Sequence, residues 1–273
     1  MTDKILNVMA IQMSSIIGEK EKNIKKVSDL IKQNIQNETD MIFLPEVWTV
    51  GWACEYFENS AENLSDSSVI KFLSETAKKY NVNIIGGSFI TKNNGKLFNT
   101  CPVIDRNGNL VATYNKCHLF TYYGDTEGLY ITKGENPIIV NIENVRIGLS
   151  ICYDIRFPEI YRAYAKNNVD MMVNMAAWPL SREIHWNSLT HARAVENQSY
   201  FIALTQTGEL PNGSLNLGKS YIIDYKGEDI DMISEKEGAI YAKLNFEEEY
   251  SFRSKCTVLK DVHNKYIVKE INL

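Results

Sequence analysis

The apolar positions of the chain follow two periods, and together they predict alternating strands and helices. After an apolar run at residues 5–13, Ile24, Val27, Ile31 and Ile35 recur at helical spacing with charged residues between them. Continuous apolar runs bounded by polar residues are typical of buried strands. The start of the chain is therefore predicted to form a strand, followed by a helix that covers one face of its sheet.

The rest of the first half continues this order. Apolar runs predict strands at residues 41–44 and 83–90, and strict helical spacing predicts a helix at residues 67–80 between them. Residues 97–104 and 110–115 flank a cluster of turn-forming residues and are predicted to pair as an antiparallel hairpin. The first half thus contains strand, helix, strand and hairpin.

The second half repeats the order. Its predicted elements are strands at residues 138–140 and 145–151, a helix, a strand at 171–175, a helix capped by Ser181 and running to about residue 198, a strand at 200–206, and a hairpin of residues 221–224 with 239–244. Because no linker separates the halves, we expect one α/β domain at residues 1–249 with two pseudo-symmetric halves. Residues 250–273 form a C-terminal segment that either packs on a partner subunit or lies on the surface.

Composition narrows the class of protein. The chain has 273 residues, of which 44% are hydrophobic and 23% charged, as in a soluble globular enzyme with a sizeable core. The net charge of -5 gives no basis for binding nucleic acid or an anionic membrane, since both require clustered positive charge. Asn7 and Gln12 interrupt the first apolar run, which is too short for a signal peptide or a membrane span. A small-molecule partner is the better expectation.

The cysteines indicate a reducing compartment. Their number is odd, they are widely spaced, and they form neither a CxxC pair nor a zinc-type Cys/His pattern. The five positions are Cys54, Cys101, Cys117, Cys152 and Cys256. We therefore expect a cytoplasmic protein without structural disulfides or a metal site.

Three polar residues stand where predicted strands end, namely Glu46, Lys116 and Cys152. Strand ends are where open α/β sheets bind ligands. A carboxylate there could take the thiol proton, the thiolate could attack an amide carbon, and the ammonium could stabilise the resulting oxyanion, with the backbone N–H of Tyr153 as a second donor. A helix beginning near Pro158, together with an adjacent cation, is expected to favour the thiolate.

Each residue alone also has a structural interpretation. A cysteine in a core strand is commonly inert, a glutamate at a strand end often caps a helix, and a single lysine is usually solvated. A Cys–His pair is the rival mechanism, but the apolar neighbourhood of His118 favours a packed histidine over a base. The other histidines that this rival would need are His185, His191 and His263.

Three motifs in order give the chain a resemblance to the nitrilase superfamily of carbon-nitrogen hydrolases. They are Phe43-Leu-Pro-Glu46, Tyr114-Asn-Lys116-Cys-His-Leu-Phe120 and Ile151-Cys152-Tyr-Asp-Ile-Arg-Phe-Pro-Glu159. The resemblance spans almost the whole chain. It implies a single-domain, four-layer α-β-β-α sandwich whose protomers associate across a helical face as a homodimer or larger homo-oligomer. It also implies a Glu-Lys-Cys triad without metal or organic cofactor.

The resemblance assigns roles to four residues. Glu46 is implied to be the general base, Lys116 the partner of the oxyanion and the leaving group, and Cys152 the nucleophile. A second glutamate after the lysine motif supports the site in this family, and Glu127 is the nearest candidate. Glu135 and Asp125 lie in the same loop and remain alternatives.

The motif around the cysteine resembles the amidase branches, whereas true nitrilases carry Trp-Glu after it. The pairs Trp178-Pro179 and His185-Trp186 are similar to the ω-amidase group, which cleaves the terminal amide of short dicarboxylate monoamides such as 2-oxoglutaramate. Trp178 is expected to form a pocket wall.

A substrate of this kind requires a cation for its free carboxylate. Arg156 or Arg182 is the candidate, although an ion pair of Arg156 with Glu159 or Asp154 is an equally simple interpretation.

The expected function is a cofactor-independent thiol amidohydrolase that releases ammonia from a small amide. Two alternatives remain open from sequence: hydrolysis of N-carbamoyl (ureido) compounds by the same triad, and a catalytically silent binding or assembly protein with the same fold. The loops at residues 121–134 and 209–218 are expected to decide the substrate, and sequence does not define their conformations.

Overall fold

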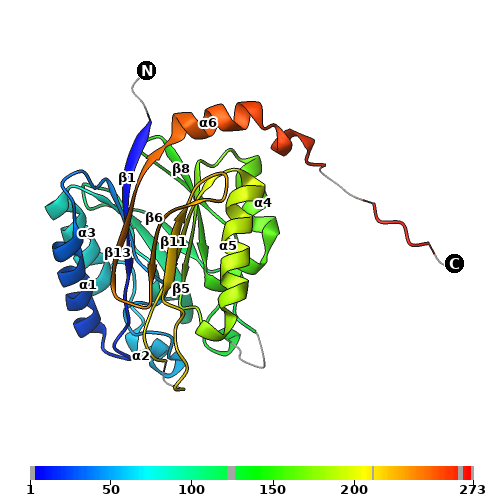
Figure 1. Ribbon diagram of the computed structural model, residues 1–273. Coiled ribbons are helices and arrows are strands. Elements are labelled where there is room, and N and C mark those ends of the chain that lie inside the picture. The colour runs from blue at the N-terminus through cyan, green and yellow to red at the C-terminus, as the bar shows by residue number, and fades with distance from the viewer. Residues whose placement is uncertain (1–3, 122–126, 211, 264–266, 272–273) are drawn as a thin grey trace.

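Two β-sheets lie face to face at the centre of the molecule, and helices cover their outer faces (Figure 1). The computed structural model describes residues 4–121, 127–210, 212–263 and 267–271. Helices α1 (Lys20–Asn34) and α3 (Ser68–Tyr80) cover one sheet, and α4 (Pro158–Lys166) and α5 (Glu183–Asn197) cover the other. The expected four-layer α-β-β-α sandwich is therefore confirmed.

The first sheet has the strand order β13-β1-β2-β3-β5-β4, with β6 paired to β5. Its strands are β1 (Ile5–Gln12), β2 (Met41–Phe43), β3 (Asn83–Ile85), β4 (Phe89–Asn93), β5 (Lys96–Ile104), β6 (Leu110–Asn115) and β13 (Gly238–Asn245). The second sheet has the order β12-β11-β10-β9-β8-β7. Its strands are β7 (Ile139–Ile142), β8 (Val145–Ile151), β9 (Met171–Ala176), β10 (Tyr200–Thr205), β11 (Lys219–Ile223) and β12 (Asp229–Ser234).

Strand β1 shows why both faces of the first sheet are buried. Val8 and Ala10 belong to the core between the sheets, whereas Met9 and Ile11 belong to the core under α1 and α3. Successive side chains of a strand point to opposite faces, so a continuous apolar run fills both cores at once. This is the physical reason that residues 5–13 show no polar alternation.

Several predicted elements are confirmed closely. The predicted strands at residues 145–151 and 110–115 coincide with β8 and β6. Helix α3 begins after Ser67, whose hydroxyl accepts a hydrogen bond from the backbone N–H of Ile70 at 3.0 Å. Such a cap satisfies one of the free N–H groups of the first helical turn.

The predicted strand at residues 83–90 is wrong as one element, because Gly86 and Gly87 break it into β3 and β4. Gly87 has a φ of +63°, and a Cβ added there would lie 2.1 Å from the carbonyl oxygen of Pro45. Only glycine allows this close approach of two backbones. The turn thereby fixes the segment that carries Glu46.

The predicted hairpin of residues 221–224 with 239–244 is also wrong. Strand β11 pairs instead with β12, and β13 crosses to the first sheet, where Ile5 lies opposite Asn245 in an antiparallel ladder with β1. Most of β12 is exposed and half of its residues are polar, so the segment has no continuous apolar run that would indicate a strand. The strand, helix, strand and hairpin order of the two halves nevertheless holds.

Helix α5 does not begin with a Ser181 cap. Ser181 lies inside a 3₁₀ turn, η5 (Leu180–Arg182), and Arg182 occupies the N-cap position without a side-chain cap. The 3₁₀ turn satisfies backbone groups locally, which makes a side-chain cap unnecessary.

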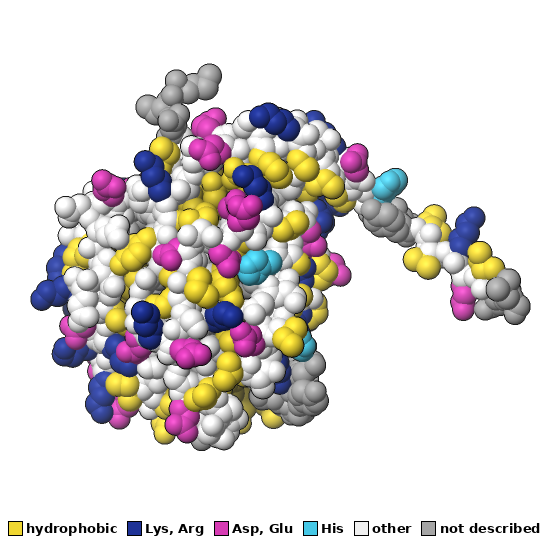
Figure 2. All heavy atoms as spheres, viewed as in Figure 1, with side chains coloured by type: hydrophobic (Ala, Val, Ile, Leu, Met, Phe, Trp, Pro, Cys, Tyr) yellow, Lys and Arg dark blue, Asp and Glu magenta, His cyan; other side chains and the backbone are white. Residues whose placement is uncertain are grey.

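The end of the chain leaves the body of the molecule. Helix α6 (Phe246–Lys255) includes the expected boundary at residue 250, and Leu259 after it still packs against the core. The tail at residues 267–271 lies away from the sandwich (Figures 1 and 2). Ile267 and Val268 in this tail are 83% and 92% exposed. None of the helices in the described ranges has both the length and the apolar character needed to span a bilayer.

Candidate active site

Strand ends from both sheets bring Glu46, Lys116 and Cys152 together. Glu46 follows β2 and Lys116 follows β6, both in the first sheet, while Cys152 directly follows β8 in the second. The ammonium Nζ of Lys116 lies 2.9 Å from Oε1 of Glu46, and both side chains are fully buried. The structure thus places the three predicted residues at one end of the space between the sheets.

Glu127 joins this group from the loop after β6. It begins a 3₁₀ turn (Glu127–Leu129), and its Oε2 lies 2.9 Å from Nζ of Lys116. The same oxygen accepts the backbone N–H of Phe120 at 2.7 Å. Glu135 is exposed, and Asp125 lies outside the described residues. Of the two described glutamates of this loop, Glu127 is the one beside Lys116.

Two further donors fix the carboxylate of Glu46. The backbone N–H of Ala177 donates to Oε2 at 2.8 Å, and Nδ2 of Asn99 donates to Oε1 at 3.0 Å. The amide of Asn99 also points to Oε1 of Glu127 at 3.4 Å. Sequence reasoning missed Asn99, although a polar residue within the apolar run 97–104 was a usable signal.

The two carboxylates determine the charge of Lys116. Burial favours the neutral amine, but Glu127 and Glu46 outweigh it and raise the pKa of Lys116 well above its usual range. Burial likewise raises the pKa of Glu127, against the opposing effect of Lys116. Lys116 is therefore a permanent cation held between two carboxyl groups.

The expectation that Cys152 carries a low-pKa thiol is wrong. Its side chain is buried, with 7% of the residue exposed, and burial raises the pKa of the thiol well above its usual range. A hydrogen bond and the charge of Glu46 raise this pKa further, while Lys116 opposes them. The resting thiol is therefore protonated and interacts with Glu46, so its ionisation requires a base in contact with it.

The backbone at Cys152 is unusual. Its φ is +45°, a left-handed conformation that residues with a Cβ rarely adopt. Cys152 is also the first residue of the 3₁₀ helix η4 (Cys152–Arg156). The N–H groups of a first helical turn point out of its N-terminus, and that of Tyr153 is one of them.

The histidine alternative has no support in the contacts of His118. Its Nδ1 lies 2.7 Å from Asp154, and its ring stacks on Phe157 with centroids 3.8 Å apart. The group that contacts the thiol of Cys152 is Glu46. His118 is thus a packed residue, as the sequence indicated, although its side chain is 34% exposed.

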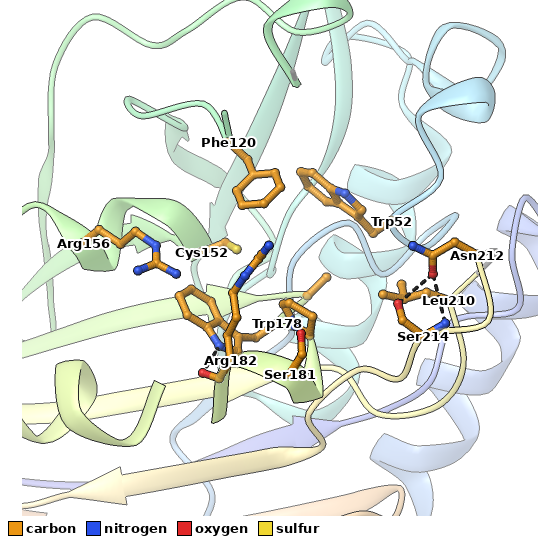
Figure 3. Close-up of a pocket in the computed structure, with 12 residues that line it drawn as sticks. Trp52, Phe120, Cys152, Arg156, Trp178, Ser181, Arg182, Leu210, Asn212 and Ser214 are labelled. Carbon is orange, nitrogen blue, oxygen red and sulfur yellow. Dashed lines mark hydrogen bonds between the residues drawn. The ribbon is translucent and has the colours of Figure 1, made fainter. Parts of the chain in front are cut away.

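A pocket of about 390 Å³ opens above Cys152 (Figure 3). The described residues that line it are Trp52, Phe120, Cys152, Arg156, Ala177, Trp178, Pro179, Ser181, Arg182, Leu210, Asn212 and Ser214. This volume is typical of small-molecule sites. Its charged lining consists of arginine only, within the described part of the chain.

Aromatic rings position both arginines. The guanidinium of Arg156 lies 5.0 Å from the centroid of the Trp178 ring, and that of Arg182 lies 5.1 Å from the Phe120 ring. The indole Nε1 of Trp178 donates to the backbone carbonyl of Arg182 at 2.9 Å. Arg156, Arg182 and Trp178 thus all line the pocket, together with Phe120.

Tyr153 and Asp154 lie beside the pocket without lining it. The ring of Tyr153 packs edge-on against Phe120 and Phe157. Asp154, one possible ion-pair partner of Arg156, binds Tyr114 and His118. Over the described ranges, no group of three His, Cys, Asp or Glu side chains is arranged to hold a metal ion.

Comparison with known proteins gives a consistent result. The model of the family described as carbon-nitrogen hydrolase matches residues 7–254. A 2-oxoglutaramate amidase of Bacillus subtilis (strain 168) is 32% identical over 255 residues, covering 93% of this chain and 96% of the relative. A 2-oxoglutaramate amidase of Paenarthrobacter nicotinovorans is 35% identical over 266 residues, covering 94% and 89%.

A solved structure supports the same family assignment as the sequence relatives. Nit3 of Saccharomyces cerevisiae, a member of branch 10 of the nitrilase superfamily, superimposes with a TM-score of 0.83 at 26% identity, covering 92% of this chain and 94% of the other. Family match, relatives and architecture lead to one assignment: the chain belongs to the carbon-nitrogen hydrolase family of the nitrilase superfamily, and it is a hydrolase of carbon–nitrogen bonds other than peptide bonds.

Proposed function

We propose that the protein is an amidase that hydrolyses the terminal amide of a short dicarboxylate monoamide through an acyl-enzyme at Cys152. The observation that carries the proposal is the buried contact of Cys152, Glu46 and Lys116 below a pocket whose charged side chains are arginines. The reaction requires no metal or organic cofactor, because these residues supply base, nucleophile and cation.

The first half of the reaction forms the thioester. Glu46 takes the thiol proton as the sulfur of Cys152 attacks the amide carbon, which removes the barrier set by the raised thiol pKa. Lys116 and the N–H of Tyr153 stabilise the oxyanion. Glu46 then returns the proton to the amide nitrogen, the carbon–nitrogen bond breaks, and ammonia leaves.

The second half regenerates the enzyme. Glu46 removes a proton from a water molecule that attacks the thioester carbon, and the carbon–sulfur bond breaks to release the carboxylic acid. The returned proton restores the thiol. Glu127 keeps Lys116 protonated and in place throughout, because it contributes a second carboxylate at 2.9 Å from the ammonium.

The pocket supports an anionic substrate. Arg156 and Arg182 line it from two sides, and a guanidinium binds a carboxylate through paired hydrogen bonds. The curated relatives named 2-oxoglutaramate amidase act on a substrate with a terminal amide at one end and a carboxylate at the other. We assign the carboxylate to Arg156 and Arg182, and the amide to Cys152.

An ammonia-release screen tests this function. The panel contains 2-oxoglutaramate, succinamate and glutaramate, simple amides without a carboxylate, ureido acids and nitriles, each assayed with the native protein and with Cys152→Ala. We expect release from the dicarboxylate monoamides, none with Cys152→Ala, and a rise in KM of about tenfold or more for Arg156→Lys or Arg182→Lys, since a bidentate contact is lost.

Other outcomes identify the alternatives. Carbon dioxide together with ammonia from ureido acids, with no turnover of amides, would identify an N-carbamoyl hydrolase. No turnover of any compound would favour a silent binding protein. Full activity of Cys152→Ala would contradict the nucleophile.

We also propose that the protein is cytoplasmic and works as a homodimer or larger homo-oligomer. All five cysteines are free thiols, which suits a reducing compartment. The tail beyond α6 exposes Ile267, Val268 and Ile271 at 80% or more, and a partner subunit would cover them.

A further inference from the structure

Asp154 is a fully buried carboxylate that accepts hydrogen bonds from three residues in two separate segments of the chain. Its Oδ1 accepts the backbone N–H of His118 at 2.9 Å and lies 2.7 Å from the ring Nδ1 of the same residue. Its Oδ2 accepts the hydroxyl of Tyr114 at 2.6 Å and the backbone N–H of Ile151 at 2.9 Å. Asp154 does not line the pocket.

The donors lie next to the two reacting groups in sequence. Tyr114 and His118 stand two residues before and two residues after Lys116, and Ile151 directly precedes Cys152. The Tyr114 hydroxyl also accepts the backbone N–H of Cys117 at 3.4 Å. Lys116 follows β6 in the first sheet and Cys152 follows β8 in the second. No hydrogen-bonded strand pair therefore holds the two residues relative to each other. Asp154 therefore connects the two sheets at the level of the site.

We propose that Asp154 is a positioning residue that sets the thiol of Cys152 against Lys116 and Glu46. Its hydrogen bond to Ile151 holds the backbone where it enters the left-handed conformation of Cys152, and its bonds to Tyr114 and His118 hold both sides of Lys116. Reaction rates fall steeply when reacting atoms move by about 1 Å. This role of Asp154 deepens the proposed function. Only the measurement of kcat rests on the proposed amide hydrolysis.

A carboxylate is required here because every partner is a donor. Both oxygens of an aspartate accept, whereas an asparagine of the same shape replaces one oxygen by an NH₂ group. The NH₂ group would face either Ile151 and Tyr114 or His118. Tyr114 can rotate its hydroxyl to accept, but a backbone N–H cannot, so at least one buried N–H loses its partner.

Asp170 supplies a matched control, because it binds the backbone of β8 at the end opposite to the one that Asp154 binds. It is 3% exposed and accepts the backbone N–H of Arg146 at 2.7 Å, the ammonium of Lys4 at 2.8 Å and the hydroxyl of Tyr250 at 2.6 Å. Arg146 lies near the start of β8, whereas Ile151 is its last residue. Asp154→Asn and Asp170→Asn thus both remove a buried carboxylate that holds β8, and only the former lies at the site.

The experiment compares these variants in the full-length protein by steady-state kinetics and by the rate at which iodoacetamide labels Cys152, followed by peptide mass spectrometry. For Asp154→Asn we expect kcat to fall about 10- to 100-fold with KM within about threefold, and labelling of Cys152 to slow by a similar factor. For Asp170→Asn we expect both rates to stay within about twofold of the native protein, although its thermal midpoint falls.

Equal effects of the two variants on kcat and labelling would overturn the proposal, because they would show a general loss of stability. If Asp154→Asn does not fold, Tyr114→Phe removes one of the hydrogen bonds and takes its place, with an expected fall in kcat and labelling of about three- to tenfold. Unchanged rates for a folded Tyr114→Phe would then overturn it. Absence of amide hydrolysis by the native protein contradicts the proposed function instead, and the labelling comparison still decides the role of Asp154.

Discussion

At the scale of single residues, the decisive feature is the placement of one ammonium between two buried carboxyl groups. Lys116 contacts Glu46 and Glu127 at 2.9 Å each, and none of the three side chains is exposed. A buried ion cluster of this kind contributes little net stability compared with apolar packing, but removing one partner leaves an uncompensated charge. We therefore attribute the cluster to the reaction at Cys152 rather than to the stability of the fold.

This view predicts the result of a double substitution. Lys116→Met should destabilise the protein by about 3–5 kcal/mol, because two carboxylates then lie together without a cation. Adding Glu127→Gln should restore a large part of the unfolding free energy in urea denaturation, since one negative charge is gone, but should restore no ammonia release. A double variant as unstable as Lys116→Met would contradict this electrostatic account.

Site residues at the ends of predicted strands can be predicted from sequence. Residues whose hydrogen bonds join separate strands cannot. Glu46, Lys116 and Cys152 are predictable because each stands where a predicted strand ends, which is where α/β sheets bind ligands, and because three family motifs contain them. Asn99 and Asp154 were not assigned, because their contacts depend on how strands of separate pairs align in space. The thiol pKa was misjudged for the same reason, since burial and the contact with Glu46 are tertiary effects.

At the scale of elements, the turn between β3 and β4 holds the segment that carries Glu46. Gly87 packs against the carbonyl of Pro45, and the backbone N–H of Ser88 donates to this carbonyl at 3.0 Å. The hydroxyl of Ser88 accepts the N–H of Val47 at 3.0 Å. The residues on both sides of Glu46 are thus fixed by one turn.

Substituting the turn glycine should therefore affect stability and activity together. Gly87→Ala places a Cβ 2.1 Å from the Pro45 oxygen, so we expect a loss of more than about 2 kcal/mol in unfolding free energy and a lower kcat. Gly95→Ala is the matched control, because Gly95 also has a positive φ of +75° but nothing lies within 4 Å of its added Cβ. It should cost about 1 kcal/mol and leave kcat unchanged. Equal losses in both variants would contradict the packing argument.

Elements with a strong apolar period were predicted well, and the others were not. Strands β1, β8 and β10 are buried along most of their length and leave continuous apolar runs in the sequence. Strand β12 is held by backbone pairing with β11 while most of its side chains face solvent, so no continuous apolar run indicates it. Backbone hydrogen bonds between strands do not depend on apolar side chains, so a hydrophobic pattern does not reveal them.

At the scale of the whole molecule, the tail beyond α6 requires an explanation. The two-sheet body is closed by its helices, yet residues 267–271 lie away from it with exposed apolar side chains (Figure 2). Exposed apolar segments of this kind usually mark an interaction site. Coverage by a second copy of the chain is the arrangement we propose.

This assembly is testable by sedimentation at several protein concentrations. The double substitution Ile267→Ser/Val268→Ser should weaken self-association by about tenfold or more, because burying each apolar side chain contributes about 1.5–3 kcal/mol. The matched control Lys269→Ser/Glu270→Ser changes two neighbouring exposed residues of the same tail and should have little effect. Identical association of both variants and the native protein would contradict the role of the tail.

The covalent intermediate gives the most direct test of the central claim that Cys152 is acylated. The native protein is mixed with 2-oxoglutaramate, quenched in acid within milliseconds, digested and measured by mass spectrometry. We predict an adduct equal to the substrate minus ammonia on the peptide that contains Cys152, with a larger amount in the steady state of any variant that slows thioester hydrolysis. Ammonia release with no adduct on that peptide, or with an adduct at another residue, would contradict the account.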